Sequence, residues 1–336
     1  MDLRLYRIAG ALLAALPAAA LDHDAMAARI LAALRLRAGD RVLVGAESGY
    51  FEELAGSLRR RVAAAGAVET RTLDQADVYL WLPRRTDLPA AERRALAEWL
   101  DRGGVRRQIH FHWAQGSVRA DGLAGEHSAA LDAVYEAALD IDYAALSRAQ
   151  DRAISRLRSG TVRVRTPAGT DLRFRVGDRP FNKQDGDASA ERMEKARVRI
   201  DREIELPAGV LRVAPLEETA GGRLVVPEAR FGAEVARGVV FHFERGVVTR
   251  VEAAENLPVV EAYLKAGGDA ARRFREFGLG FNPKLPGLAY FGYGSGVVRL
   301  SLGDNQELGG AVRGGFVRWF FFPDATVEVD GKPVGR

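Results

Sequence analysis

A change of pattern near the middle of the chain constrains the fold more than any other feature. In the first half, short apolar runs alternate with segments of helical periodicity. The runs that read as strands are 41–44, 68–72, 77–82 and 108–113, and the helical segments are 22–38, 50–65 and 89–102. Strands that alternate with helices indicate βαβ units and a parallel sheet. We therefore predict an α/β, Rossmann-like domain over residues 1–150.

After Ser159-Gly160 the helical periodicity gives way to short alternating runs. The alternation in 161–165 and 172–176, on either side of the turn at 166–171, predicts a β-hairpin. Further strands are predicted at 210–213, 223–226, 239–244 and 247–252, followed by a helix over 256–274. Residues 151–336 are thus predicted to form a β-rich α+β domain.

Composition excludes several classes of function. The 336 residues carry 49 basic and 45 acidic side chains, a balance that argues against a nucleic-acid partner. There is no cysteine, which excludes thiolate nucleophiles and cysteine-ligated metals. The arginine-rich and alanine-rich usage is typical of a GC-rich bacterial genome. No run reaches the roughly 20 apolar residues of a membrane span, so we expect no membrane partner.

The N-terminal segment allows two interpretations. Two arginines within Met1–Arg7 precede the mostly apolar stretch Ile8–Leu21, a pattern that fits a signal peptide. Pro17 interrupts this stretch, however, and its apolar part is short. We interpret it as the first helix of a globular domain and expect a cytoplasmic protein.

Five motifs follow one another in the second half of the chain: Thr166–Asp171 (TPAGTD), Leu206–Pro215 (LPAGVLRVAP), Ala271–Pro283, Val298–Gly303 and the glycine-rich end from Gly303 to Gly331. Their order resembles that of the M29 metallo-aminopeptidases, the aminopeptidase T-like family, and the chain resembles that family over most of its length. In the family, the third motif is a helix and turn that contains the second ligand glutamate. The resemblance implies the M29 fold and a homodimer.

The family binds one or two divalent metals through two glutamates, two histidines, a tyrosine and an aspartate. Transferred position by position, these ligands fall on Val210, Glu276, Arg299, a residue near Gln306, Val317 and Trp319, and a shift by one would put Arg318 at the second histidine. Only Glu276 has a side chain that binds metals, and a catalytic zinc usually keeps three protein ligands. We therefore expect no metal and no other cofactor. The same losses argue against the iron chemistry of a related branch, the dihydroxypyridine ring-cleaving dioxygenases.

Two other motifs lie in the first half. His110 and His112 would share one face of a strand and, with His127 or a nearby acid, could bind a metal, although pocket-lining histidines are the more ordinary interpretation. The loop Gly45–Gly49 lies where a nucleotide loop belongs but lacks the glycine patterns of such loops.

These observations predict a catalytically silent M29-like protein that binds a peptide or a small acidic ligand in the former active-site cleft. Glu276 and Arg299 should form an ion pair in place of the metal. Arg299 or Arg318 could hold a carboxylate, and Trp319, on one strand face with Val317 and Phe321, could hold an apolar group. Such a protein fits an accessory role in a peptide-modifying biosynthetic pathway. The alternative is a metal-independent peptide or amide hydrolase that uses Glu276 as general base and Arg299 as oxyanion stabiliser. A third interpretation is a purely structural dimer partner.

Overall fold

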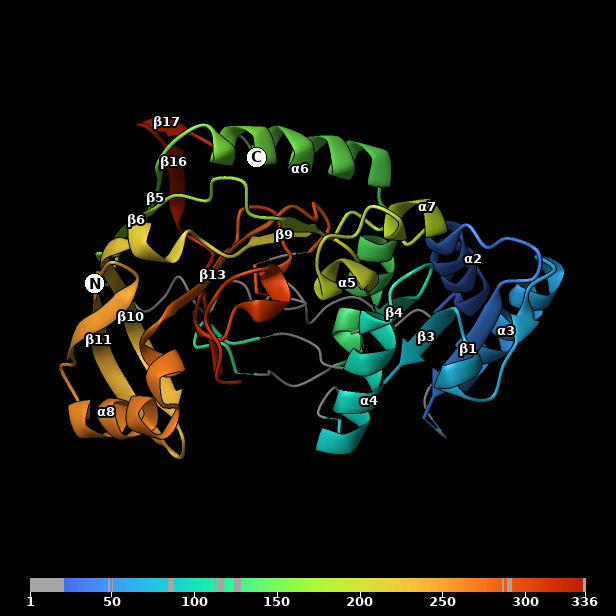
Figure 1. Ribbon diagram of the computed structural model, residues 1–336, viewed down its shortest axis with the longest axis horizontal. Helices are drawn as coiled ribbons and strands as arrows, with labels where there is room; N and C mark the ends of the chain where they lie inside the picture. The colour runs from blue at the N-terminus through green and yellow to red at the C-terminus, as the bar shows by residue number, and fades with distance from the viewer. Residues whose placement is uncertain are drawn as a thin grey trace.

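The computed structural model describes residues 21–334, except 48, 50, 84–87, 112, 114–117, 124–127, 286 and 289–291. One part is a parallel sheet covered by helices, and the other contains two antiparallel sheets (Figure 1). The predicted N-terminal helix lies outside the described residues except for Leu21. No helix in the described part of the chain combines the length and the apolarity needed to cross a bilayer.

The parallel sheet confirms the predicted α/β architecture of the first half. Its strand order is β2-β1-β3-β4-β8, with every neighbouring pair parallel. The strands are β1 (Arg41–Ala46), β2 (Val68–Glu69), β3 (Val78–Leu82), β4 (Arg107–Phe111) and β8 (Glu203–Leu206). Helices α2 (His23–Leu34), α3 (Glu52–Ala64) and α4 (Ala90–Asp101) accompany them. Strand β8 comes from far beyond residue 150, so the parallel sheet crosses the predicted domain boundary. The division into two domains stays a prediction.

The β-rich half forms two antiparallel sheets. The larger has the order β12-β11-β10-β6-β5-β16-β17. The smaller, which we call the five-stranded sheet, has the order β15-β14-β13-β9-β7. The larger comprises β5 (Val162–Arg165), β6 (Asp171–Phe174), β10 (Gly221–Phe231), β11 (Glu234–Glu244), β12 (Val247–Glu252), β16 (Thr326–Val329) and β17 (Lys332–Pro333). The smaller comprises β7 (Phe181–Lys183), β9 (Val210–Val213), β13 (Phe274–Gly280), β14 (Val298–Gly303) and β15 (Val317–Phe322). The predicted hairpin is β5–β6.

Aromatic side chains join the two antiparallel sheets. The ring of Phe174 on β6 lies 5.4 Å from that of Phe277 on β13, and Phe241 on β11 lies 5.8 Å from Phe320 on β15. These rings are buried, and their burial is the main stabilising contribution of this contact. The other face of the five-stranded sheet is therefore left to carry polar groups.

The segment around Glu276 differs from the sequence-based expectation. The predicted helix over 256–274 ends early: α8 spans Leu257–Ala266, and Gly267-Gly268 and a short 3₁₀ turn follow. Glu276 lies on strand β13 rather than in a helix and turn. The strand is favoured because Phe274, Phe277 and Leu279 are all buried.

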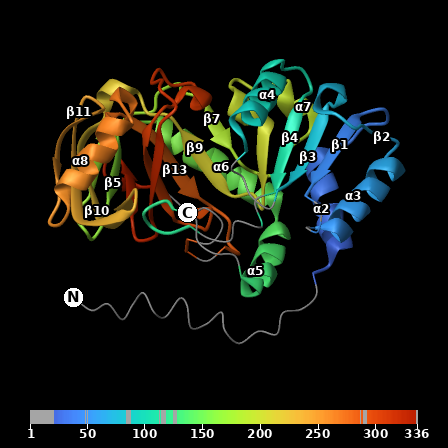
Figure 2. The ribbon, with the colours of Figure 1, turned by 90° about the horizontal axis from the view of Figure 1, so that it is seen from below.

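Two helices connect the halves, α5 (Ala129–Leu139) and α6 (Tyr143–Arg158). Asp142 caps α6 by accepting a hydrogen bond from the amide of Ala145 at 2.8 Å. Figure 1 shows α6 lying along the outside of the molecule, and Figure 2 shows β9 and β13 between the two lobes. Buried Gln150 of α6 donates to the backbone oxygens of Gln184 and Val210, which ties this helix to the five-stranded sheet.

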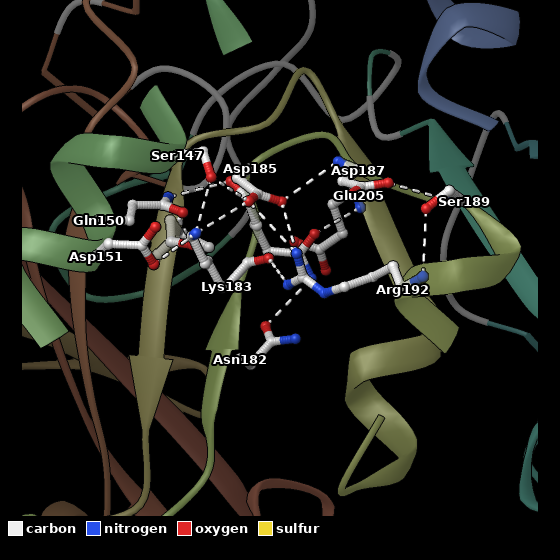
Figure 3. A network of polar contacts seen from close by, with 12 residues as sticks. Ser147, Gln150, Asp151, Asn182, Lys183, Asp185, Asp187, Ser189, Arg192 and Glu205 are labelled. Carbon is white, nitrogen blue, oxygen red and sulfur yellow. Dashed lines mark hydrogen bonds and ion pairs between the residues drawn. The ribbon is translucent and has the colours of Figure 1, made fainter. Parts of the chain in front are cut away.

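A polar network beside α6 strengthens this junction (Figure 3). We call it the lysine network: Lys183, Ser147, Asp151, Asp185 and Arg192. Lys183 Nζ donates to Ser147 at 2.8 Å and to Asp151 at 2.6 Å, and it lies 3.3 Å from Asp185. Asp185 also accepts from Ser147 at 2.8 Å and from Arg192 at 3.1 Å. Two cations thus meet two carboxylates.

Candidate functional site

The face of the five-stranded sheet that points away from the larger antiparallel sheet carries most of the residues that sequence analysis selected. Arg212 on β9 pairs with Gly278 on β13, which pairs with Arg299 on β14. One step along, Glu276 pairs with Ser301, which pairs with Trp319 on β15. Directly paired residues point to the same face of a sheet, and so do residues two apart on one strand. Arg212, Glu276, Arg299 and Trp319 therefore converge.

A β-bulge adds one more arginine to this face. The register of β13 against β14 shifts between Phe274 and Glu276, so Arg275 has no direct partner across the ladder. Such a bulge turns an extra side chain to one face of the strand. Both Arg275 and Glu276 consequently contribute to the same group of charges.

Glu276 lies at the centre of three guanidinium groups. Its Oε1 accepts from Arg212 Nε at 2.9 Å and from Arg299 Nε at 2.8 Å, while its Oε2 accepts from Arg212 Nη2 at 3.1 Å and from Arg275 Nη1. The predicted Glu276–Arg299 ion pair is confirmed. Gly278 leaves space for it, because a Cβ there would lie 3.3 Å from Arg299 Cβ and 3.5 Å from Glu276 Oε1.

A second carboxylate completes what we call the arginine cluster: Arg212, Arg275, Arg299, Glu276 and Glu307. Glu307 lies on the short 3₁₀ turn Gln306–Leu308. Its Oε1 accepts from Arg212 Nη2 at 2.9 Å and from Arg275 Nη2, and Arg275 Nε also donates to the backbone oxygen of Asp304 at 2.5 Å. Three cations here share two carboxylates.

The arginines keep both carboxylates ionised. Burial alone would raise the pKa of Glu276, but the charges of Arg212, Arg299 and Arg275 lower it well below its usual value. The pKa of Glu307 is lowered in the same way, against burial, by Arg275 and Arg212. By contrast, burial and the nearby charge of Glu307 raise the pKa of Glu203 on β8 to about 8. Glu276 is therefore a poor proton acceptor.

Trp319 covers part of the arginine cluster. The Cζ atoms of Arg275 and Arg299 lie 5.7 and 5.6 Å from the centre of its ring, within the range of cation–π attraction. Its side chain also packs against a small apolar group formed by Val118, Leu288, Val297 and Phe321. Trp319 Nε1 and Ser301 Oγ are buried and have no hydrogen-bond partner among the described residues. The site thus combines charge, an aromatic surface and polar atoms that have no partner in the described part of the chain.

The other selected residues occupy different positions. Arg318 points away from the cluster, with its guanidinium over the rings of Phe231, Tyr263 and Phe320. It donates to the backbone oxygen of Arg230 at 2.8 Å. The arrangement does not place Arg318 with Arg299 as a second group for holding a ligand.

Val210 and Val317 lie at the margins of the cluster. Val210 is buried two residues before Arg212 on β9. Val317 is half-buried at the start of β15 and pairs with Gly303. Gln306 is exposed, and the neighbouring Glu307 is the side chain that enters the cluster.

Sequence analysis missed Arg212, Arg275 and Glu307. A signal existed for Arg212, because it lies two residues after Val210 and therefore shares its strand face. Glu307 was one residue from the selected Gln306. For Arg275 the sequence offered no signal, since strand alternation puts it opposite Glu276 and only the bulge brings the two together.

The histidines singled out in the first half do not form a described metal site. The ring of His110 stacks on Trp81 with centroids 4.1 Å apart. His112 and His127 lie outside the described residues. Among the residues that are described, no three His, Asp or Glu side chains gather closely enough to hold a metal ion.

Comparison with known proteins defines the fold class. No family model matches the chain, and no curated protein matches it. The fold is that of a group of α/β proteins with a parallel sheet and an antiparallel β-rich region, represented by two solved structures.

One is the 2,5-dihydroxypyridine dioxygenase from Pseudomonas putida, with a TM-score of 0.62 and 16% identity, covering 93% of this chain and 94% of the dioxygenase. The other is AmpT from Thermus thermophilus, with a TM-score of 0.54 and 15% identity, covering 91% of this chain and 94% of AmpT. The relationship to AmpT is a distant structural one. Identities this low show a shared fold and leave the chemistry to be argued from the site.

Proposed function

We propose that this protein is a non-catalytic member of the AmpT-like fold that binds a peptide or small acidic ligand beside the arginine cluster. The observation that carries the proposal is the environment of Glu276. This carboxylate, the one position of the M29 ligand pattern that keeps a metal-binding side chain, accepts hydrogen bonds from three arginines. Guanidinium groups occupy the acceptor positions that a cation would use, and their charges repel one.

The same environment argues against the hydrolase alternative. A general base needs a pKa near the working pH, whereas the pKa of Glu276 is lowered well below its usual value. An oxyanion stabiliser needs a free donor, whereas Arg299 donates from Nε and Nη2 to Glu276 at 2.8 and 2.5 Å. The two groups that the alternative requires are engaged with each other.

Features around the cluster favour binding. Trp319 offers an aromatic surface that is only half-buried, next to apolar Val297 and Phe321. The indole N–H and the Ser301 hydroxyl are polar groups that a peptide backbone can satisfy. An aromatic anchor with a few convergent polar groups is the usual composition of a ligand site. An accessory role in a peptide-modifying pathway, a cytoplasmic location and a homodimer remain predictions.

Equilibrium dialysis of the full chain against a synthetic tetrapeptide library, read by mass spectrometry with and without EDTA, tests the proposal. We expect a subset of intact peptides to be retained, EDTA to have no effect, and Trp319→Ala to reduce retention about tenfold. Val68→Ala, at an exposed hydrophobic side chain on β2, is the control and should bind as the parent does.

Two results count against the proposal. Retention that EDTA abolishes would show that a metal holds the ligand. Shortened peptides that disappear with Glu276→Gln would favour the metal-independent hydrolase instead.

A further inference from the structure

Glu307 is the most accessible member of the arginine cluster. Its side chain is 30% exposed, whereas those of Arg212 and Arg275 are 4% and 1% exposed and that of Glu276 is fully buried. Glu307 contacts the two arginines through the single atom Oε1. It projects from a turn of three residues and is not held within a strand. Of the two carboxylates, it is therefore the one that can leave without opening the sheet.

We propose that Arg212 and Arg275 form a binding site for a carboxylate of the ligand, and that Glu307 occupies this site until the ligand arrives. The inference rests on the proposed function, because it names the chemical group recognised beside the arginine cluster. Two guanidinium groups whose Nη2 atoms converge on one oxygen suit a planar carboxylate. Exchange of one carboxylate for another leaves the charge of the cluster unchanged, so neither arginine becomes a buried, unpaired cation.

Glu276 stays in place during this exchange. It has no exposed surface and keeps contacts with all three arginines. Arg299 remains directed at Glu276 by two hydrogen bonds. The inner ion pairs therefore act as a rigid support that positions Arg212 and Arg275.

Two buried polar atoms provide a second, independent observation. Trp319 Nε1 and Ser301 Oγ are buried without a partner among the described residues, and they lie on the same sheet face as the arginines. A buried donor without an acceptor is costly, so a ligand that supplies the acceptor is favoured here. Because Arg275 lies over the indole ring, a ligand held by Arg275 also comes close to Trp319. A ligand with an acceptor beside its carboxylate, such as the end of a peptide, matches both features.

Glu307 competes with the ligand for the two arginines. The apparent affinity for the ligand is therefore the intrinsic affinity multiplied by the fraction of molecules in which Glu307 has left the site. Neutralising Glu307 should therefore strengthen carboxylate binding. Glu307→Gln is the suitable change because glutamine keeps the volume of the side chain and creates no cavity. Glu218→Gln is the matched control: Glu218 is a highly exposed glutamate that also pairs with an arginine, Arg245, at 3.1 Å.

Calorimetric titration of the full chain with succinate tests the inference, with succinamide as the neutral probe. We expect Glu307→Gln to bind succinate about tenfold more tightly than the parent chain, with no change for succinamide or for Glu218→Gln. In the double variant Glu307→Gln/Arg275→Met the gain should disappear. Glu307→Ala repeats the test should the glutamine variant fold poorly.

Equal succinate affinities in the parent and Glu307→Gln chains, or a gain that persists without Arg275, would overturn the inference. The peptide dialysis separates it from the proposed function. Peptides retained equally with free and amidated C-termini and with no acidic side chain would sink the carboxylate site alone. A succinate gain without any peptide retention would instead sink the peptide-binding function and leave the carboxylate site standing.

Discussion

The arginine cluster and the lysine network are both groups of charges that include strands of the five-stranded sheet, but they differ in burial and in the number of carboxylates for each cation. The lysine network matches two cations with two carboxylates, and its outer carboxylate, Asp151, is 62% exposed (Figure 3). The arginine cluster has three cations for two carboxylates, and its central carboxylate, Glu276, is fully buried. Equal numbers of cations and carboxylates suit a structural contact between α6 and β7, because each charge has a partner. A group of arginines beside an aromatic ring is what an acidic ligand needs.

Acidic side chains outside the arginine cluster also act on its charges. Burial lowers the pKa of Arg299, and the negative charges of Glu276 and of Glu205 on β8 oppose this shift. Glu205 also adds to the charges of Glu276 and Glu307 that, against burial, raise the pKa of Arg212. Glu203, two residues away on the same strand, is the acid whose pKa is raised to about 8. Strand β8 belongs to the parallel sheet, so the cluster lies where the parallel and antiparallel parts of the fold meet.

The largest difference should appear when the central carboxylate of each group is neutralised. Glu276→Gln leaves three buried arginines with Glu307 as their remaining carboxylate in the cluster, and removing one partner of a buried pair costs about 3–5 kcal/mol. Asp185→Asn leaves Lys183 with Asp151 and Arg192 with the backbone oxygen of Lys183, so we expect a loss of about 1–3 kcal/mol. Urea denaturation measures both free energies of unfolding.

Asp151→Asn serves as the surface control for this pair, with an expected loss below about 1 kcal/mol. Equal losses for Glu276→Gln and Asp185→Asn would break the comparison, because the two groups would then be equivalent structural ion-pair networks.

The pH dependence of stability sharpens the comparison. The pKa of Glu203 rises from an ordinary value of 4.5 to about 8 on folding. The folded chain binds this proton more tightly, so the stabilisation is complete below the ordinary value and is lost as the pH rises through about 8. The shift of about 3.5 pKa units, at ~1.4 kcal/mol per unit, sets an upper bound of about 5 kcal/mol on the pH dependence that Glu203→Gln should remove across this window.

Glu276 and Glu307 titrate in the opposite sense. Their lowered pKa values give stabilisation that is present above the ordinary glutamate value and is lost only as the pH falls below it. They should therefore add no slope in the window where Glu203 acts. Urea denaturation at a series of pH values, with Glu218→Gln as the exposed control, checks this. A slope that survives Glu203→Gln would assign the titration to another group.

Much of the fold followed from sequence, whereas the site followed only in part. Strand alternation predicted the hairpin β5–β6 and the face shared by Val317, Trp319 and Phe321. The pairing of Glu276 with Arg299 was predicted through a family resemblance and is present. Alternation also puts Arg318 on the opposite face from Trp319, so its place among Phe231 and Phe320 could have been foreseen.

The features that could not be predicted from the sequence depend on irregular strand pairing and on contacts between distant segments. The bulge at Arg275 breaks the period of two on which strand predictions rest. Strand β8 pairs with β4 although it lies about 90 residues later in the chain. No local sequence pattern predicts a pairing between such distant segments. The acid of the 3₁₀ turn, Glu307, approaches Arg212 only through the tertiary fold.

The smallest expected effect comes from filling the space that Gly278 leaves in the arginine cluster. A Cβ at this position would lie 3.3 Å from Arg299 Cβ and 3.5 Å from Glu276 Oε1. The ion pair would have to shift by a few tenths of an ångström, so we expect Gly278→Ala to lower the free energy of unfolding by about 1 kcal/mol. Gly56→Ala on α3 is the matched control, because its Cβ would meet only the end of the Arg60 side chain at 3.6 Å. Alanine favours a helix interior over glycine, so this control should stabilise the chain by about 0.5–1 kcal/mol. A Gly278→Ala chain as stable as its parent would mean that the arginines adjust freely, and the rigid support assigned to Glu276 and Arg299 would then be wrong.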